Sequence, residues 1–365
     1  MALSIGIVGL PNVGKSTLFT ALTNQGGLAA NYPFATIEPN VGIVPVPDER
    51  LQALANIVHP GRIVPATVEF VDIAGLVKGA NEGEGLGNQF LANIRETDAI
   101  VQIVRFFADG DVTHVEGAVD PDRDAGIINT ELVLADIGTL DKALPRLEKE
   151  ARRDKESAAK AELAAQMLAW LNEGNRAASY GFGSEEERAL LYDLHLITMK
   201  PVLYVANIGE DEVSDFAANQ ATVAGLATVP ISAKVEADIA ELATEDPEAA
   251  AEFLASLDLD ESGLARLTRE AYQLLGLHSF FTAGEMEVKA WTIPVGAKAP
   301  QAAGVIHTDF EKGFIKAETA SFSDYIAFGG EAGLRSAGKL RQEGKEYVVQ
   351  DGDVMHFKSG LASNK

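Results

Sequence analysis

The sequence predicts an α/β fold that combines a nucleotide-binding domain with a helical insertion and a smaller C-terminal module. Three observations support this class. A phosphate-binding pattern lies near the N-terminus between an apolar strand and a helix, helical periodicity runs from residue 127 to about residue 200, and short strands follow residue 278. A chain of 365 residues is too long for one ordinary hydrophobic core, so we expect two or three domains.

Composition and charge exclude several classes of protein. With 47% apolar and 23% charged residues the chain resembles soluble globular proteins, and no run approaches the roughly eighteen apolar residues that span a bilayer. It opens without a secretion signal and holds no cysteine, so we expect a cytoplasmic protein without disulfides. The net charge of −24 disfavours DNA binding, but residues 278–365 hold ten basic and eleven acidic residues, a net charge of −1. Only this last segment has a net charge close enough to zero to approach a polyanion such as RNA without strong electrostatic repulsion.

The first predicted elements are a strand over residues 4–8 and a helix that begins at Ser16. Between them, Gly9–Thr17 fits the pattern G-x-x-x-x-G-K-[ST]. Its glycines let several N–H groups point at one anion, Lys15 reaches the outer phosphates, and the Ser16 hydroxyl ligates Mg²⁺. A tight connection is the alternative, but both flanks favour a nucleoside triphosphate site. The candidate nucleotide-binding residues of this loop are Asn12, Val13, Gly14, Lys15, Ser16 and Thr17.

Two further motifs occupy the positions of the metal-sensing switches of small P-loop GTPases. Thr36 lies in a proline-punctuated loop ahead of a strand predicted for residues 41–46, and it is a candidate Mg²⁺ ligand when a γ-phosphate is bound. Asp72 ends a strand over residues 67–72 and opens the motif Asp-x-x-Gly. In this motif the aspartate holds Mg²⁺ through water, and the N–H of Gly75 contacts the γ-phosphate. The candidate metal residues are Ser16, Thr36 and Asp72.

The group that orients the attacking water is not evident from these motifs. Leu76 stands where Ras-like enzymes carry a glutamine, so either hydrolysis is slow or another group positions the water. His114 follows a buried strand predicted for residues 99–104 and is a candidate for this role, with a surface position lacking any catalytic role as the alternative. The candidate catalytic residues are Lys15, Gly75 and His114.

A helical insertion interrupts the nucleotide-binding domain. Leucines recur at three- and four-residue steps on both sides of a charged stretch, residues 148–162, which indicates two antiparallel helices with a solvated tip. A strand resumes over residues 200–207. The expected division is therefore residues 1–127 and 200–277 for the nucleotide-binding domain, 128–199 for the insertion and 278–365 for the C-terminal module.

The base-reading motif departs from the usual guanine reader, Asn-Lys-x-Asp. Here Asn207 is followed by Ile208 and Glu210, and a Ser-Ala-Lys triplet begins at Ser232. A carboxylate one methylene longer fits guanine poorly, whereas adenine requires Glu210 to turn away and backbone or Asn207 to contact its amine. We therefore expect ATP to be preferred over GTP. The candidate base-reading residues are Asn207, Ile208, Glu210, Ser232 and Ala233.

The C-terminal module is predicted to be a small mixed sheet. Strands are expected over residues 290–293, 314–317 and 354–357, around one helix near Asp309. A module of this kind is usually a binding platform. The basic side chains that could meet RNA phosphate, or equally form solvated edges, are His307, Lys312 and Lys316.

Taken together these motifs resemble the YchF / Obg-like ATPase family, a branch of the translation-factor-related P-loop GTPases. The resemblance runs nearly end to end. It implies a P-loop G domain with a mostly parallel sheet and helices on both faces, an inserted coiled-coil arm and a C-terminal ubiquitin-like β-grasp (TGS) domain. The residues that carry it are 9–17, 31–40, 72–76, 207, 210, 304–318 and 347–353.

The resemblance also implies an activity. Family members prefer ATP, hydrolyse it slowly and associate with the ribosome, particularly with the large subunit and its RNA. A leucine at position 76 is normal in the family, and His114 matches the segment of a loop histidine thought to assist hydrolysis. Asn12 resembles an asparagine that helps to hold K⁺ in some related NTPases, although we prefer a loop-shaping role for it. The tail after residue 358 departs from the family ending and is assigned no role.

The resulting hypothesis is a Mg²⁺-dependent ATPase that acts as a conformational switch on the ribosome. Two alternatives stay open. One is a GTPase that tolerates a degenerate base reader, and the other is a nucleotide-gated scaffold for which hydrolysis is incidental. A small-molecule kinase is disfavoured because the switch motifs and the base-reading pair would have no evident purpose there.

Overall fold

The structure, a computed structural model, describes residues 3–24, 40–73, 86–108, 118–213, 222–223 and 225–360. They separate into two compact units. Unit 1 contains the described residues of 1–44 and 69–267, and unit 2 contains those of 45–68 and 268–365. Residues 45–68 therefore group with the C-terminal part of the chain, whereas the sequence-based ranges include them in residues 1–127. The finer division into four ranges stays a prediction.

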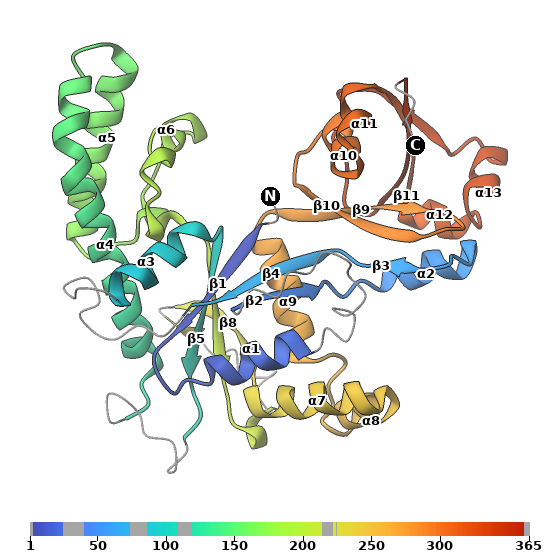
Figure 1. Cartoon of the computed structure of the whole chain (residues 1–365), viewed down its shortest axis with the longest axis horizontal. Helices are drawn as coiled ribbons and strands as arrows, with labels where there is room; N and C mark the ends of the chain where they lie inside the picture. The colour runs from blue at the N-terminus through green and yellow to red at the C-terminus, as the bar shows by residue number, and fades with distance from the viewer. Residues whose placement is uncertain are drawn as a thin grey trace. The chain divides into compact units, whose positions relative to one another are not determined.

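A seven-stranded sheet forms the centre of unit 1 (Figure 1). Its strands are β1 (Ser4–Gly9), β2 (Val41–Pro45), β4 (Thr67–Asp72), β5 (Ala99–Arg105), β6 (Val202–Asn207), β7 (Thr222–Val223) and β8 (Leu226–Ile231), in the order β2-β4-β1-β5-β6-β8-β7. β1 pairs in parallel with β4 and β5, β5 with β6, and β6 with β8. Parallel strands end at one edge of a sheet, so Gly9, Asp72 and Asn207 are brought to the same edge.

Two helices, α1 (Lys15–Asn24) and α3 (Leu86–Glu96), connect strands of this sheet. Three more follow its last strand: α7 (Ala233–Glu245), α8 (Pro247–Ser256) and α9 (Gly263–Leu274), and the boundary between the units after Leu267 falls within α9. α1 packs against α7, and the inner positions Leu18 and Leu22 of α1 are buried. Within the described ranges, every helix is too short or too polar to cross a membrane.

Glu236 joins the first turn of α7 to the start of α9. The residue is 3% exposed, and its carboxylate accepts backbone hydrogen bonds from Gly263 at 2.7 Å and from Leu264 at 3.3 Å. Burial raises the pKa of this carboxyl from 4.5 to about 7, although the two backbone hydrogen bonds act in the opposite direction. The group is therefore protonated in the folded chain at pH values where it is charged in the unfolded chain.

This raised pKa predicts a pH-dependent stability. Because the folded chain binds the proton more tightly, the contribution of Glu236 is fully present below about pH 4.5 and is lost as the pH rises through about 7, by about 3 kcal/mol in total. Glu236→Gln is neutral at every pH and does not lose this contribution. The urea midpoint of the variant minus that of the wild type should therefore increase between about pH 5 and pH 8. The exposed Glu241→Gln on the same helix is the control. Parallel pH profiles for all three chains would contradict this assignment.

A helical arm is inserted between β5 and β6. α4 (Pro121–Glu150) and α5 (Lys155–Asn172) pack against each other as a hairpin (Figure 1) and share an apolar core that includes Leu140 and Met167. Asp120 accepts a hydrogen bond from Arg123 N and caps α4, so this helix begins ahead of residue 127. The arm is completed by α6 (Glu185–Ala189) and by the 3₁₀ helices η2 (Ala177–Ser179), η3 (Tyr192–Leu194) and η4 (Ile197–Met199).

A six-stranded mixed sheet forms the core of unit 2. Its strands are β3 (Ile63–Val64), β9 (Leu277–Ala283), β10 (Val288–Pro294), β11 (Phe314–Ser321), β12 (Arg341–Glu343) and β13 (Asp353–Ser359), in the order β12-β11-β13-β9-β10-β3. β9 and β10 are antiparallel, as are β11 and β13, whereas β13 and β9 are parallel. The helices of this unit are α2 (Glu49–Val58), α10 (Ala299–Ile306), α11 (Thr308–Lys312), α12 (Phe322–Ala327) and α13 (Glu331–Ser336).

The C-terminal module is more elaborate than the sequence predicted. The three expected strands are present in β10, β11 and β13, and the helix near Asp309 is α11, but β9, β12 and three further helices after residue 278 were missed. α12 and α13 have six residues each, too few to show a helical period in the sequence. His307 Nδ1 accepts a hydrogen bond from Asp309 N at 3.1 Å, and Lys316 Nζ donates to Gln342 at 3.0 Å, so both side chains have structural contacts.

Candidate functional site

The loop between β1 and α1 has the backbone that a phosphate cradle requires. Asn12 and Gly14 have φ angles of 64° and 90°. A Cβ atom on Gly14 would lie 2.3 Å from Asn207 Nδ2, and one on Gly9 would lie 2.8 Å from Val13 Cγ2. Both the positive φ and the close approach therefore require glycine at position 14.

Asn207 holds this loop against the base-reading segments. Its Nδ2 donates to the carbonyl of Val13 at 2.8 Å, and its Oδ1 accepts a hydrogen bond from Ala233 N at 3.0 Å. The residue is 4% exposed. Ile208 N donates to the carbonyl of Ile231 at 3.0 Å, which ties β6 to the end of β8. One asparagine thus fixes the phosphate loop and the start of α7 relative to each other.

These segments enclose a cavity of about 830 Å³ within unit 1. A cavity of this size suits a ligand as large as a nucleotide. It extends from the phosphate loop, through the end of β5, to the residues that follow β6 and β8. The predicted site residues that line it are Asn12, Gly14, Thr17, Asn207, Ile208, Glu210, Ser232 and Ala233.

Ser232 offers an unused polar group to this cavity. The residue is 3% exposed, and in the described part of the chain its Oγ has no hydrogen-bond partner. A buried hydroxyl without a partner is unfavourable by about 1–3 kcal/mol, and a ligand that supplies a partner recovers this energy. The side chain therefore favours a polar ligand beside the start of α7.

Lys15 and Asp72 form an ion pair next to the cradle. Their side chains are 10% and 18% exposed. Asp72 is held at the end of β4 by its own N–H, which donates to the carbonyl of Asn40 at 2.7 Å. A carboxylate here and the Ser16 hydroxyl at the start of α1 are both hard oxygen donors, which suit Mg²⁺.

Glu210 does not point freely into the cavity. Its carboxylate pairs with Lys234, and both side chains are largely exposed, at 50% and 70%. Gly209 N donates to Glu212 at 2.9 Å and shapes the turn that presents Glu210. The carboxylate is therefore drawn towards the N-terminal turn of α7.

Phe107 is a lining residue that the sequence did not single out. Its N–H donates to the carbonyl of Asn207 at 3.2 Å, and the guanidinium of Arg105 lies 4.2 Å from its ring centroid. Arg105 is 1% exposed, and its Nε donates to the carbonyl of Phe107 at 3.1 Å. A flat ring held in this way offers a stacking surface for a base. A single aromatic after a strand gives no recognisable signal in the sequence.

Some of the predicted site residues do not belong to the part of the chain that the structure describes. Thr36, Gly75 and His114, together with Leu76, lie outside the described residues. Val13 takes part through its carbonyl, and Ser16 is exposed on the first turn of α1. The described candidates thus converge from the ends of β1, β4, β6 and β8.

Comparison with known proteins identifies the family. The protein named ribosome-binding ATPase YchF from Escherichia coli O157:H7 is 53% identical over 367 residues, which cover 98% of this chain and 99% of that protein. The chain belongs to the YchF family. The YchF protein of the same name from Bacillus subtilis (strain 168) is 52% identical with the same coverage.

A solved structure and two family models agree with this membership. The structure of the Schizosaccharomyces pombe YchF GTPase matches with a TM-score of 0.86 at 39% identity, over 98% of this chain and 97% of that chain. Residues 4–134 match a model described as a 50S ribosome-binding GTPase. Residues 277–360 match the YchF GTPase C-terminal model, described as a protein of unknown function. The expected family and the P-loop G-domain fold are confirmed.

Proposed function

We propose that this chain is a Mg²⁺-dependent ATPase that acts as a nucleotide-controlled switch on the ribosome. The observation that carries the proposal is the cavity in which Asn207 joins the phosphate loop to the start of α7. The YchF proteins of Escherichia coli O157:H7 and Bacillus subtilis are both named ribosome-binding ATPases, which supports the activity and the partner. A ribosomal partner, with large-subunit RNA as its expected contact, supports a cytoplasmic location.

The ion pair of Glu210 supports the preference for adenine. Guanine recognition needs a carboxylate that accepts hydrogen bonds from the base, but Lys234 competes for this carboxylate. Adenine offers an acceptor at ring N1, so it is best served when Glu210 is held aside. The Oγ of Ser232, which has no hydrogen-bond partner within the described ranges, and the ring of Phe107 could each contact either purine.

Hydrolysis would use few protein groups. Lys15 would leave Asp72 and meet the phosphates, while the N–H groups of the loop and of the first turn of α1 surround them. Ser16, Asp72 and Thr36 would hold Mg²⁺, which neutralises the charge that develops on the phosphates. We assign γ-phosphate sensing to Gly75 and positioning of water to His114. Asn12 would shape the loop, with a K⁺ ligand as its alternative role.

Nucleotide titration tests the base preference. With fluorescent analogues, ATP should bind at least about tenfold more tightly than GTP, since one mismatched buried polar contact is enough for that ratio. Lys234→Ala frees Glu210 and should lower the ATP-to-GTP ratio by about threefold. The exposed Lys142→Ala on the arm is the control. A clear GTP preference of the wild type would instead favour a GTPase with a degenerate base reader.

Ribosome association tests the switch. Co-sedimentation with large ribosomal subunits should depend on whether ATP, ADP or no nucleotide is present, because the bound nucleotide selects the binding conformation. Association that is identical in all three states would favour a scaffold whose hydrolysis is incidental.

A further inference from the structure

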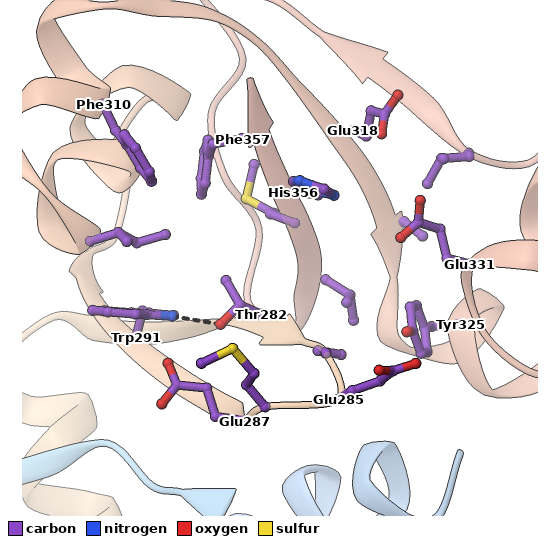
Figure 2. A pocket seen from close by; sticks show the side chains of 18 residues that line it. Thr282, Glu285, Glu287, Trp291, Phe310, Glu318, Tyr325, Glu331, His356 and Phe357 are labelled. Atoms are coloured by element: carbon purple, nitrogen blue, oxygen red, sulfur yellow. Dashed lines mark hydrogen bonds between the residues drawn. The ribbon is translucent and has the colours of Figure 1, made fainter. Parts of the chain in front are cut away.

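Unit 2 contains a groove that is separate from the nucleotide cavity. Its volume is about 590 Å³, within the range of ligand sites. The turn between β9 and β10 forms one wall, and β13 forms the other, as Figure 2 shows around Thr282, Glu285, His356 and Phe357. Nothing in the proposed ATPase cycle requires this groove.

The backbone edge of β13 is open where it borders the groove. On one side β13 pairs with β11 from residue 353 to residue 359. On the other side, in the described part of the chain, the pairing with β9 is limited to Val354 with Phe281, and β9 ends two residues later, at Ala283, before the chain turns back into β10. Among the described residues, 355–358 therefore have no strand partner on that side. An open strand edge within a groove is complementary to another extended backbone.

One face of this edge is aromatic. Trp291 and Phe310 lie on the same side of the strand that carries Phe357 (Figure 2). Trp291 Nε1 donates to Thr282 Oγ1 at 2.9 Å, and Lys289 Nζ lies 3.6 Å from the centroid of the ring, so the ring is fixed. This face suits an aliphatic or aromatic side chain.

The opposite face is acidic. Glu318, Glu331 and His356 place ligand atoms within 4.8 Å of one another, but Arg335 already pairs with both carboxylates and Lys358 lies 3.6 Å from Glu318. Two cations in the cluster oppose the binding of a metal ion. Within the described ranges the neighbouring Glu285 has no ion pair, so this face keeps an excess of negative charge.

We propose that the groove binds a short extended peptide of a protein partner as an added strand on β13. Alternate side chains of a strand point to opposite faces. The bound segment would therefore alternate apolar side chains, directed at Trp291 and Phe310, with basic side chains, directed at Glu285 and Glu331. Backbone hydrogen bonds to β13 provide affinity, and the two unlike faces select the sequence.

Trp291 provides a direct reporter of binding. The chain holds two tryptophans, so the full-length Trp170→Phe variant leaves Trp291 as its only one. The probe is the peptide acetyl-Lys-Phe-Lys-Val-Lys-amide. We expect a saturable change in the fluorescence of Trp291, and an analogue with Glu in place of Lys should bind at least about tenfold more weakly. No saturable change up to millimolar peptide would overturn the proposal.

Backbone methylation distinguishes strand addition from side-chain binding. One analogue carries N-methyl groups on Phe and Val, and the other carries them on the three lysines. Because only one edge of the peptide can pair with β13, one analogue should lose about tenfold or more in affinity while the other retains binding. Equal binding of the parent and both analogues would overturn strand addition, as would equal quenching by a single-stranded RNA oligonucleotide.

A variant and its matched control test the acidic face. Glu285→Gln removes one exposed charge and should lower the affinity for the parent peptide by about threefold. The analogue with Glu in place of Lys should still bind more weakly than the parent peptide. Glu252→Gln, an exposed site on α8 in unit 1, should leave the affinity unchanged. Equal affinities for the wild type and the Glu285 variant would contradict the assigned orientation of the peptide.

Discussion

Replacing Lys15 with alanine is expected to lower the rate constant of ATP hydrolysis by at least about a hundredfold. Lys15 is the cation that the first turn of α1 supplies to the phosphate loop. Its side chain is 10% exposed and forms an ion pair with Asp72. Because Asp72 is a candidate Mg²⁺ ligand, the ammonium group of Lys15 already lies close to the proposed metal position. Alanine cannot compensate the negative charge that develops on the transferred phosphoryl group. Single-turnover hydrolysis at saturating Mg²⁺ and ATP measures the effect directly.

Because Lys15 also forms an ion pair, the alanine variant can lose stability as well as activity, and control variants separate the two effects. Lys15→Ala leaves the carboxylate of Asp72, 18% exposed, without its partner, so a lower thermal midpoint is also expected without nucleotide. Lys15→Ala, Asp72→Asn and the double variant form a mutant cycle in which stability should couple. Lys142→Ala, on the arm, should change neither quantity. Hydrolysis that persists at the wild-type rate in Lys15→Ala would show that the lysine serves only the ion pair.

The strands and the phosphate loop of unit 1 could be predicted because their signals are local. Gly9 and Gly14 stand at a strand-to-helix turn, and both are required there by contacts that the structure shows. The strands expected over residues 4–8, 41–46, 67–72, 99–104 and 200–207 are all present in the sheet. Periodicity and turn residues are properties of short segments, so one sequence is enough to detect them.

The contacts that assemble the site could not be predicted in the same way. Asn207 and Val13 are 194 positions apart, and the hydrogen bond between them depends on how β6 and β1 are ordered in the sheet. The pairing of Glu210 with Lys234, 24 positions apart, is likewise a product of tertiary packing. The sequence named Glu210 as a base reader, but only the fold reveals what holds its carboxylate.

The helical arm illustrates the same limit. Its two helices follow from leucine periodicity, and the turn at residues 151–154 falls within the charged stretch predicted as the tip. What fixes the arm's base is Asp136, which no pattern indicated. It is fully buried in α4, and it accepts hydrogen bonds from Ile197 N at 2.7 Å, Thr198 N at 2.7 Å and Thr198 Oγ1 at 2.6 Å. Burial raises the pKa of this carboxyl, although these three hydrogen bonds favour its charged form.

Asp136→Ala is therefore expected to destabilise unit 1 by about 4 kcal/mol, because three buried donors at η4 lose their acceptor together. Asp136→Asn should lose less, since one oxygen remains, but its amide would face a donor. Hydrogen exchange should accelerate first at Ile197 and Thr198, whose N–H groups are released. Asp141→Ala, an exposed site on the same helix, should stay within about 0.5 kcal/mol of the wild type. A loss below about 1 kcal/mol for Asp136→Ala would mean that water replaces the carboxylate, and the arm would then be held mainly by its apolar core.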